Sequence, residues 1–398
     1  MSLNRGILFN FISRFGGALA NLAISILISR ELGAEVKGSH ALFIAGVAML
    51  QLPAGWFGSA ALVYLTPRHD HRKLLYISNN WVLLCMIPLW TVLRYFDIIP
   101  VDISIELLIA SISFGWWNNY SHILLGREEN KAFNLLQFLH PISTLLLTVA
   151  LFWIQEPSLA AFAKAYLISQ LINLVTAGVL VHKKGLQESS DSYANLIGVM
   201  RRHGFFLQLA NLTQFLNYRI LYFFVDFYFG KQVLGVYSNA QSLVEAVWMV
   251  TRSISTIQFG RIANSSDDKA NRDLTRKYAF ISLVVSFVCI VPLIVLPSDF
   301  FTTLFGKDFS GLSEYIYLIA PAILAMSMGN IYAHYFAGSG RNLVNFTGSF
   351  INLCSTLLCF FLLKDTFGVH TAPVVSSISF GLHLFFHLGY FRFGPASK

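Results

Sequence analysis

The sequence has 398 residues, of which 55% are hydrophobic and only 12% are charged, and its mean hydropathy is +0.60. Soluble domains carry about 25% charged residues, so this composition excludes an ordinary soluble protein. Four scattered cysteines without a paired motif argue against a disulfide framework or a zinc site, and the net charge of +8 does not by itself indicate nucleic-acid binding.

Mostly apolar runs of about 20 residues, each long enough to cross a bilayer, recur along the chain. We predict twelve transmembrane helices, at 7–29, 41–65, 74–96, 103–125, 132–154, 159–181, 204–229, 236–260, 278–297, 312–337, 343–363 and 369–391. The predicted fold is therefore an all-α polytopic membrane protein. The loops between these spans are too short for a folded soluble domain.

Lysine and arginine residues concentrate in alternate loops, which is the pattern expected when the basic loops stay in the cytoplasm. The basic loops contain Arg68, Arg72 and Lys73; Arg127 and Lys131; Lys183, Lys184, Arg201 and Arg202; and Lys269, Arg272, Arg276 and Lys277. The loops between them are poorer in basic residues. Both termini are therefore predicted to be cytoplasmic, and the positive net charge comes mostly from the inner loops.

The two halves of the chain contain a similar turn. Its residues recur at a constant offset of 197, with Gly33, Val36 and Gly38 matching Gly230, Val233 and Gly235. Six spans per half is an even number, so both halves insert the same way up, as parallel repeats. We predict an N-terminal six-helix lobe at 1–183, a cytoplasmic linker at 184–203 and a C-terminal six-helix lobe at 204–398, arranged around a central cavity. Chance similarity between two short glycine-containing turns is the alternative.

The seventh and eighth spans carry ionisable residues at membrane depth, where charges usually face a polar interior and mark a pathway or site. At 100° per residue, each span has one polar stripe. The stripes consist of Gln208, Asn211, Arg219, Tyr222 and Asp226 on the seventh span and Ser238, Gln241, Glu245, Arg252 and Thr256 on the eighth. Two interpretations are open: contacts between helices inside a bundle, or a polar central cavity.

The same stretch resembles a known family. NYRI at 217–220, GxxxxGVYSNAxSLVEAVW at 230–248 and FGRIA at 259–263 are similar to the seventh and eighth helices of bacterial polysaccharide flippases. ISRELGAEVKGSHAL at 28–42, LFGKDFSG at 304–311 and AGSGR at 337–341 resemble other segments of that family. These flippases belong to the multidrug/oligosaccharidyl-lipid/polysaccharide exporter (MOP) superfamily.

The resemblance implies a function. Such proteins are similar to carriers that move an undecaprenyl-diphosphate-linked sugar repeat unit from the cytoplasmic to the outer leaflet by alternating access, for O-antigen, capsule or exopolysaccharide biosynthesis. It implies a bacterial plasma membrane, H⁺ or Na⁺ as candidate coupling ions without other cofactors, and a polysaccharide polymerase, assembly proteins and membrane lipids as partners. Two departures concern Leu221, where members often carry aspartate, and Gly260, where they often carry proline. Ion coupling at the position of Leu221 is therefore not carried over.

Three arginines within the spans are candidate ligands for the diphosphate: Arg14, Arg219 and Arg252. Guanidinium groups bind phosphate oxygens bidentately and stay protonated when partly desolvated. The candidate sugar contacts are Asn21, Gln208, Asn211, Tyr222 and Gln241, with Asn79, Asn80, Asn118 and Asn119 as further amides. Asp226 and Glu245 are candidates for neutralising an arginine or binding a coupling ion. The alternatives are snorkelling for Arg14 and a structural role for Arg252.

Other functions predict other patterns. A cation-coupled drug exporter of the same superfamily would have an acidic, aromatic cavity, whereas basic groups outnumber acidic ones in these spans. A membrane-embedded polymerase or ligase would place catalytic residues in a large outer loop, so we predict a carrier rather than an enzyme. His383 and His387 have a metal-ligand spacing but no evident third ligand, so no metal site is predicted.

Overall fold

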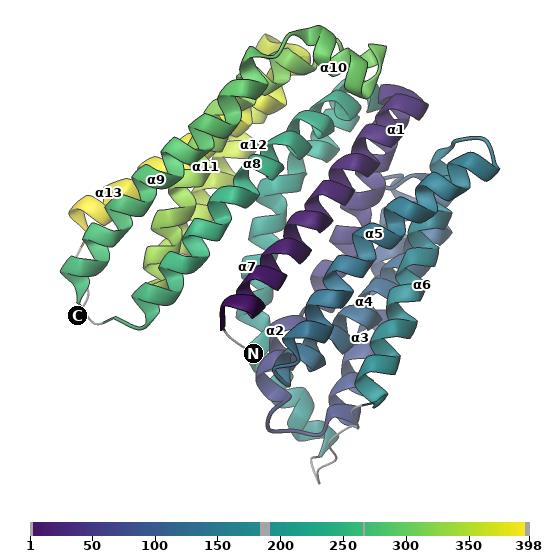
Figure 1. The fold of residues 1–398 in the computed structure, drawn as a ribbon, viewed down its shortest axis with the longest axis vertical. Coiled ribbons are helices and arrows are strands. Elements are labelled where there is room, and N and C mark those ends of the chain that lie inside the picture. Colours follow the sequence, from purple (N-terminus) through teal and green to yellow (C-terminus); the bar gives the residue numbers. More distant parts are fainter. Residues whose placement is uncertain (1–2, 184–191, 266, 395–398) are drawn as a thin grey trace. The chain divides into compact units, whose positions relative to one another are not determined.

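The computed structural model describes residues 3–183, 192–265 and 267–394, and these residues form helices and connecting turns without a strand (Figure 1). The elements are α1 (Leu3–Ala54), α2 (Ser59–Leu65), α3 (His71–Tyr95), η1 (Val101–Ile103), α4 (Ser104–Gly126), α5 (Asn130–Ile154), α6 (Leu159–Lys183), α7 (Tyr193–Phe229), α8 (Lys231–Ala263), α9 (Asp268–Val295), α10 (Ser298–Phe305), η2 (Lys307–Phe309), α11 (Leu312–Gly338), α12 (Asn342–Phe367), η3 (Gly368–His370) and α13 (Thr371–Phe393). The all-helical prediction is confirmed.

The helices follow the predicted spans except at two places. The second span is not one helix, because α1 ends at Ala54 and α2 begins at Ser59, after a turn that contains Gly55 and Gly58. The short helix α10 lies in what was predicted to be a loop. Pro297 precedes its first residue, and Phe301 and Phe305 anchor it because both are fully buried.

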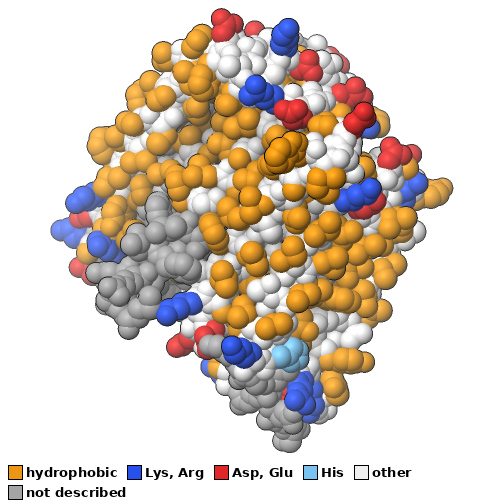
Figure 2. All heavy atoms as spheres, turned by 45° about the vertical axis from the view of Figure 1, so that its right-hand side comes forward, with side chains coloured by type: hydrophobic (Ala, Val, Ile, Leu, Met, Phe, Trp, Pro, Cys, Tyr) orange, Lys and Arg blue, Asp and Glu red, His pale blue; other side chains and the backbone are white. Residues whose placement is uncertain are grey.

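The helices have the surface of a membrane protein. Within the described residues, seven helical stretches are long and apolar enough to span a bilayer. Asn342–Phe393 covers two predicted spans, and Phe15–Ala54 contains parts of two. On the face in Figure 2, hydrophobic side chains cover most of the middle, and charged ones gather mainly toward the ends. Long helices with exposed apolar side chains fit lipid contact, so this chain is a multi-pass membrane protein.

The described chain divides into two compact units. Unit 1 comprises Met1–Leu32 and Ser39–Leu212, and unit 2 comprises Gly33–Gly38 and Thr213–Lys398. The division falls inside α7, which begins at Tyr193, and part of the predicted linker, 184–191, lies outside the described residues. The lobe boundaries given by the sequence therefore stay a prediction.

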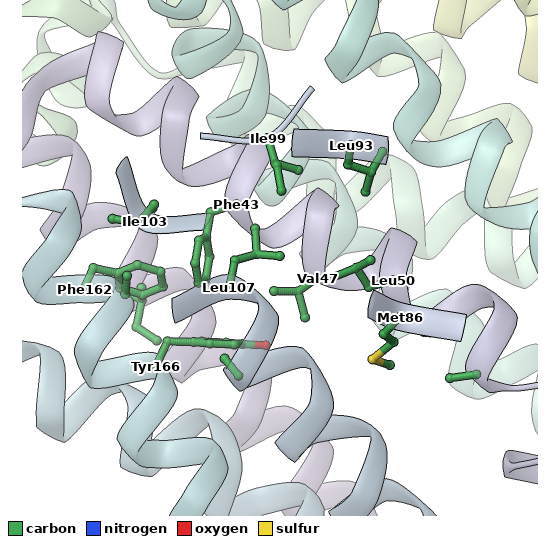
Figure 3. Close-up of a cluster of buried hydrophobic side chains, with 14 of the residues drawn as sticks. Phe43, Val47, Leu50, Met86, Leu93, Ile99, Ile103, Leu107, Phe162 and Tyr166 are labelled. Carbon is green, nitrogen blue, oxygen red and sulfur yellow. The ribbon is translucent and has the colours of Figure 1, made fainter. Parts of the chain in front are cut away.

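Helix α4 is the centre of unit 1, since it packs against α2, α3, α5 and α6. The apolar core beside it contains Phe43, Leu107 and Phe162, which come from α1, α4 and α6 and lie close together in Figure 3. Phe43 meets Phe162 edge-on, with 5.8 Å between ring centroids. Buried polar groups find partners in the same unit: the Trp117 indole N–H donates to Gln170 Oε1 at 2.7 Å, joining α4 to α6.

Helix α11 has the corresponding place in unit 2, where it packs against α8, α9, α12 and α13. Its buried residues Tyr332, Tyr335 and Phe336 form a core with Phe391 of α13. Counting spans within each half, α4 and α11 are both the fourth. The central helix of each unit is therefore the same member of the predicted repeat.

The predicted repeat is also visible in the backbone. Gly33 has φ 77° and ψ −180°, and Gly230 has φ 86° and ψ 170°. Both positive φ values lie in a region that side chains disfavour, so glycine is required at both helix breaks. Gly33 divides α1 into two helices, and Gly230 separates α7 from α8.

The helices that follow these two breaks meet within unit 2 in a reciprocal way. A Cβ on Gly38 would collide with the carbonyl oxygen of Lys231, and a Cβ on Gly235 would collide with the carbonyl oxygen of Ala34. Each glycine thus lets one helix approach the backbone of the other. The offset of 197 relates Ala34 to Lys231 as well as Gly38 to Gly235, so the contact is symmetric under the repeat.

Candidate functional site

The candidate site in unit 2 begins with an ion pair between α7 and α8. Arg219 Nη2 lies 3.1 Å from Glu245 Oε1 and 3.4 Å from Oε2. The two helices run in opposite directions from Gly230, and at 1.5 Å per residue both side chains lie about 15–25 Å along their helices from this break. Both side chains are partly buried, with 23% and 33% exposed.

Two tyrosines hold the Arg219 guanidinium in place. Its Nη1 donates to Tyr222 Oη at 2.7 Å, and the guanidinium carbon lies 4.9 Å from the centre of the same ring. The Tyr222 ring meets Tyr237 edge-on at 5.7 Å, and Tyr237 Oη lies 3.2 Å from Ser376 Oγ on α13. The position of Arg219 is therefore fixed by contacts that extend to a third helix.

Lys37 is a second basic residue of this site. It follows the break at Gly33 and is buried, with 3% of its surface exposed. It interacts electrostatically with both Arg219 and Glu245. The site therefore contains two basic side chains, Lys37 and Arg219, and one carboxylate, Glu245. Basic side chains donate hydrogen bonds to the oxygen atoms of an anion, so this group is suited to bind one.

Sequence reasoning missed Lys37 because this residue lies between the predicted spans 7–29 and 41–65, in a loop predicted to lie outside. The repeat shows that its side chain points inward. Leu234 occupies the matching position at the offset of 197, and it is fully buried in α8. A lysine at the equivalent position of the other repeat is therefore expected to point inward as well.

Arg252 lies apart from this ion pair. It is seven residues beyond Glu245, which is about 10 Å along α8, and its guanidinium lies 5.0 Å from the centre of the Trp248 ring. Trp248 in turn packs on Tyr218, with 5.6 Å between ring centroids. Arg252 is exposed, so the structure places it on an aromatic surface near the site rather than within the cluster.

Two predicted sugar contacts lie in the unit 1 part of α7. Asn211 Nδ2 is 3.4 Å from Gln208 Oε1, and Gln208 packs against Gly55, where a Cβ would collide with that oxygen. Asn21 is an exposed residue of α1 in the same unit. The polar stripe predicted along α7 is therefore divided between the two units.

The remaining predicted residues lie at different depths of unit 2. Gln241 is buried one turn before Glu245 on α8. Asp226 is partly buried at the end of α7, where it interacts electrostatically with Lys231 rather than with Arg219. Of the two predicted acids, Glu245 is thus the one paired with the central arginine. The side chain of Arg14 lies outside the described residues, although its backbone belongs to α1.

A separate pocket of about 390 Å³ lies in unit 1, on α3, α4 and α6. Asn79, Asn80, Trp116 and Tyr120 line it, together with Leu83, Leu174 and Gly178. Asn79 is already engaged, because its Oδ1 accepts from Asn119 Nδ2 and its carbonyl oxygen accepts from the Trp116 indole, each at 3.1 Å. Asn80 is engaged as well, because its Nδ2 donates to the carbonyl oxygen of Tyr76 at 2.7 Å, so both lining amides already have partners within unit 1.

Comparisons with known proteins agree with this architecture. Residues 83–314, which include Arg219 and Glu245, match the model of a family described as "Polysaccharide biosynthesis protein". No curated protein matches the chain in a sequence comparison.

Solved structures of transporters have the same fold. An inward-facing multidrug resistance MATE family transporter of the MOP superfamily is 15% identical, with a TM-score of 0.75 and 94% of each chain covered. The lipid II flippase MurJ in an inward closed conformation is 14% identical, with a TM-score of 0.75, and 98% of this chain and 88% of that chain are covered. An outward-facing MATE transporter gives a TM-score of 0.69 at 14% identity, covering 97% of this chain and 93% of that chain.

The family match covers more than half of the chain, and the shared fold extends over nearly all of it. The chain therefore belongs to the family described as "Polysaccharide biosynthesis protein", and it has the fold of the MATE and MurJ structures.

Proposed function

We propose that this protein flips undecaprenyl-diphosphate-linked oligosaccharide repeat units from the cytoplasmic to the outer leaflet, by alternating access, during surface polysaccharide biosynthesis. Family membership supports the pathway, and the likeness to a lipid II flippase supports a lipid-linked substrate. On this proposal the protein is a carrier and not an enzyme. It works in the bacterial plasma membrane with both termini in the cytoplasm, and beside a polysaccharide polymerase.

The observation that carries the proposal is the group of Lys37, Arg219 and Glu245. A diphosphate cannot cross a slab of low dielectric constant unassisted, because the idealised cost of burying one ion is of order 20 kcal/mol. The basic side chains of Arg219 and Lys37 offset part of this cost. Glu245 pairs with Arg219 while no anion is bound, and the incoming diphosphate replaces Glu245 as the partner of Arg219.

The other predicted residues have proposed roles in the same transport cycle. Arg14 and Arg252 are the further cations that meet the diphosphate as it enters and leaves. Asn21, Gln208, Asn211, Tyr222 and Gln241 are the hydroxyl and amide groups that contact the sugars. Asp226 and Glu245 are the carboxylates available for a coupling proton or sodium ion.

A second candidate is a cation-coupled exporter of small molecules. The partly buried Glu245 carboxylate favours it, since such a group can exchange an ion for a cationic drug, and the MATE structures have the same fold. The second basic side chain, Lys37, argues against it, because a cavity that binds cationic drugs is expected to be acidic.

Flipping in proteoliposomes tests the proposal. Undecaprenyl-diphosphate oligosaccharide is placed in the inner leaflet, and its arrival outside is scored with an impermeant glycosidase. We expect Arg219→Ala to abolish flipping and Arg219→Lys to retain part of it, because lysine keeps the charge but loses bidentate binding. The control is Arg276→Ala, which removes an exposed arginine that forms an ion pair with Asp273 on α9.

Flipping by Arg219→Ala at the wild-type rate would remove this arginine from the mechanism. A folded wild-type protein that flips no lipid but exports a cationic dye would favour the second candidate.

A further inference from the structure

Two histidines of α13, one helical turn apart, lie in a slot between α11 and α12. The ring centroids of His383 and His387 are 4.3 Å apart, and His387 is fully buried. Glycines make the slot: a Cβ on Gly348 of α12 would collide with the His387 ring, and a Cβ on Gly329 of α11 would lie 3.2 Å from His383 Nδ1. The mechanism proposed above uses neither histidine.

Both ring nitrogens of His387 face oxygen atoms. Its Nδ1 lies 3.0 Å from the carbonyl oxygen of His383, and its Nε2 lies 3.2 Å from Asn345 Oδ1 on α12. The orientation of the Asn345 amide is fixed, because its Nδ2 donates to the carbonyl oxygen of Ala333 on α11 at 2.8 Å. The oxygen of that amide therefore has to be the atom that faces His387.

A neutral imidazole cannot satisfy this arrangement. It carries a single N–H, so whichever nitrogen bears the proton, the lone pair of the other nitrogen points at an oxygen. An imidazolium has two N–H donors and satisfies both contacts at once. Hydrogen bonds to a charged group are also stronger than those between neutral groups, which offsets part of the cost of burying the charge.

We propose that His387 is a proton-binding site and that Asn345 is the group that responds to its charge. Proton binding converts the imidazole to an imidazolium whose Nε2–H donates to Asn345 Oδ1. The carbonyl oxygen of His383 belongs to the helix backbone and cannot turn away, so Nδ1 keeps its proton and Nε2 loses the other. The Nε2 lone pair then faces Asn345 Oδ1, so the Asn345 amide turns and gives up its bond to Ala333. The charge of His387 thereby controls a link between α12 and α11.

His387 and His383 together can take up only one additional proton. The described residues that meet its ring are His383 and Phe386 on α13, Phe336 on α11, and Asn345 and Gly348 on α12. Only His383 among them is titratable, and two charges at 4.3 Å would repel each other, so the pair takes up a single proton. Within the described residues, no third histidine, cysteine or carboxylate joins His383 and His387 in a group that could hold a metal ion.

In the predicted topology, His387 lies near the cytoplasmic end of α13. His387 is six residues before the end of α13 at Phe393, which is about 9 Å along the helix. The consequence for transport rests on the proposed function: a proton at His387 would be the coupling ion, in place of an ion at Asp226 or Glu245.

The test is a titration of the imidazole nitrogens by NMR. Protein labelled with ¹⁵N-histidine is purified without any lipid-linked sugar and measured between about pH 5 and 8, and His387 is assigned by the signals lost in His387→Gln. We expect its two ring nitrogens to move to imidazolium shifts as the pH falls through this range. Asn345→Leu should bind the proton about tenfold more weakly, because one hydrogen bond to a charged group is lost.

Two further comparisons keep the test decisive. Asn345→Asp presents a carboxylate to Nε2 and should bind the proton more tightly than wild type, so the proposal does not depend on the folding of the leucine variant. His334 is the matched control, since its Nδ1 lies 2.8 Å from the carbonyl oxygen of Asn330, four residues earlier on α11. Its titration should be the same in wild type and both Asn345 variants.

A His387 that stays neutral over this range, or one whose titration is the same in all three proteins, would overturn the proposal. Because the titration uses no substrate, its result is independent of whether the chain flips a diphosphate lipid.

Discussion

The two helix breaks at Gly33 and Gly230 have nearly the same backbone but different chemistry. Both glycines have positive φ, and the helices that follow them approach each other through Gly38 and Gly235. The charges do not follow the repeat. At the offset of 197, Lys37 matches Leu234, Arg219 matches Leu22, and Glu245 matches Ala48.

This difference separates architecture from function. Glycine is required at both breaks by the backbone conformation and at both crossings by the close approach of another main chain. Lys37, Arg219 and Glu245 have no counterparts in the repeat, so packing symmetry does not account for them. We therefore propose that these three residues serve ligand binding, and the substitutions below test that proposal.

The largest effect on stability is expected for Leu234→Lys, which places a lysine at the position that matches Lys37 in the other repeat. Leu234 is fully buried, so the lysine would be a buried charge that lacks the carboxylate available to Lys37. We expect a loss of about 3–5 kcal/mol in the free energy of unfolding, measured by denaturation in detergent. Leu234→Met is the control, and equal stability of the two variants would contradict this account of the site.

Next in size is Gly235→Ala, which breaks the reciprocal crossing. The added methyl group would collide with the carbonyl oxygen of Ala34, so we expect a loss of about 1–3 kcal/mol in the free energy of unfolding. Gly260→Ala on the same helix is the control, because no atom lies within 4 Å of its Cβ position. Its stability should rise slightly, since alanine favours the helix. If both variants responded alike, the crossing would not matter for stability.

Lys37→Leu makes the first break resemble the second. We expect flipping of the diphosphate lipid to fall about tenfold, the effect of losing one charged contact to the ligand. The unfolding free energy should not fall, because a buried lysine is replaced by an apolar side chain. Lys307→Leu, which changes an exposed lysine, is the control. Unchanged flipping by Lys37→Leu would separate the buried lysine from transport.

Glu245→Gln should have the smallest effect. The amide keeps the shape of the side chain but no longer competes for Arg219, so the diphosphate lipid should bind about threefold more tightly, as expected for a weak, partly exposed ion pair. Its maximal flipping rate should fall, because release slows. Saturation curves of the flipping rate measure both quantities, and weaker binding would show that Glu245 contacts the ligand directly.

Much of the fold could be predicted from the sequence, because apolar runs, basic loops and glycine turns are local signals. The repeat offset found at Gly33 and Gly230 reappears in the backbone of both breaks. What could not be predicted was the pairing between helices. Arg219 bonds to Glu245 and not to Asp226, since the rotation and depth of two helices relative to each other decide which side chains meet.

Lys37 shows a second limit of the sequence pattern. A lysine beside a turn is usually solvated, and only the match to a buried leucine indicates otherwise. The break between α1 and α2 was also missed. Hydropathy is continuous through 41–65, whereas the backbone turns at Gly55 and Gly58.

We propose that the basic side chains of Lys37 and Arg219 in unit 2 bind the diphosphate of a lipid-linked sugar. The most direct measurement is the affinity of detergent-purified protein for two prenyl lipids that differ only in having a diphosphate or a neutral head group, compared between wild type and Arg219→Gln. The account predicts that wild type prefers the diphosphate lipid and that Arg219→Gln loses this preference while binding the neutral lipid as before. An equal loss of affinity for both lipids, or no preference in wild type, would contradict it.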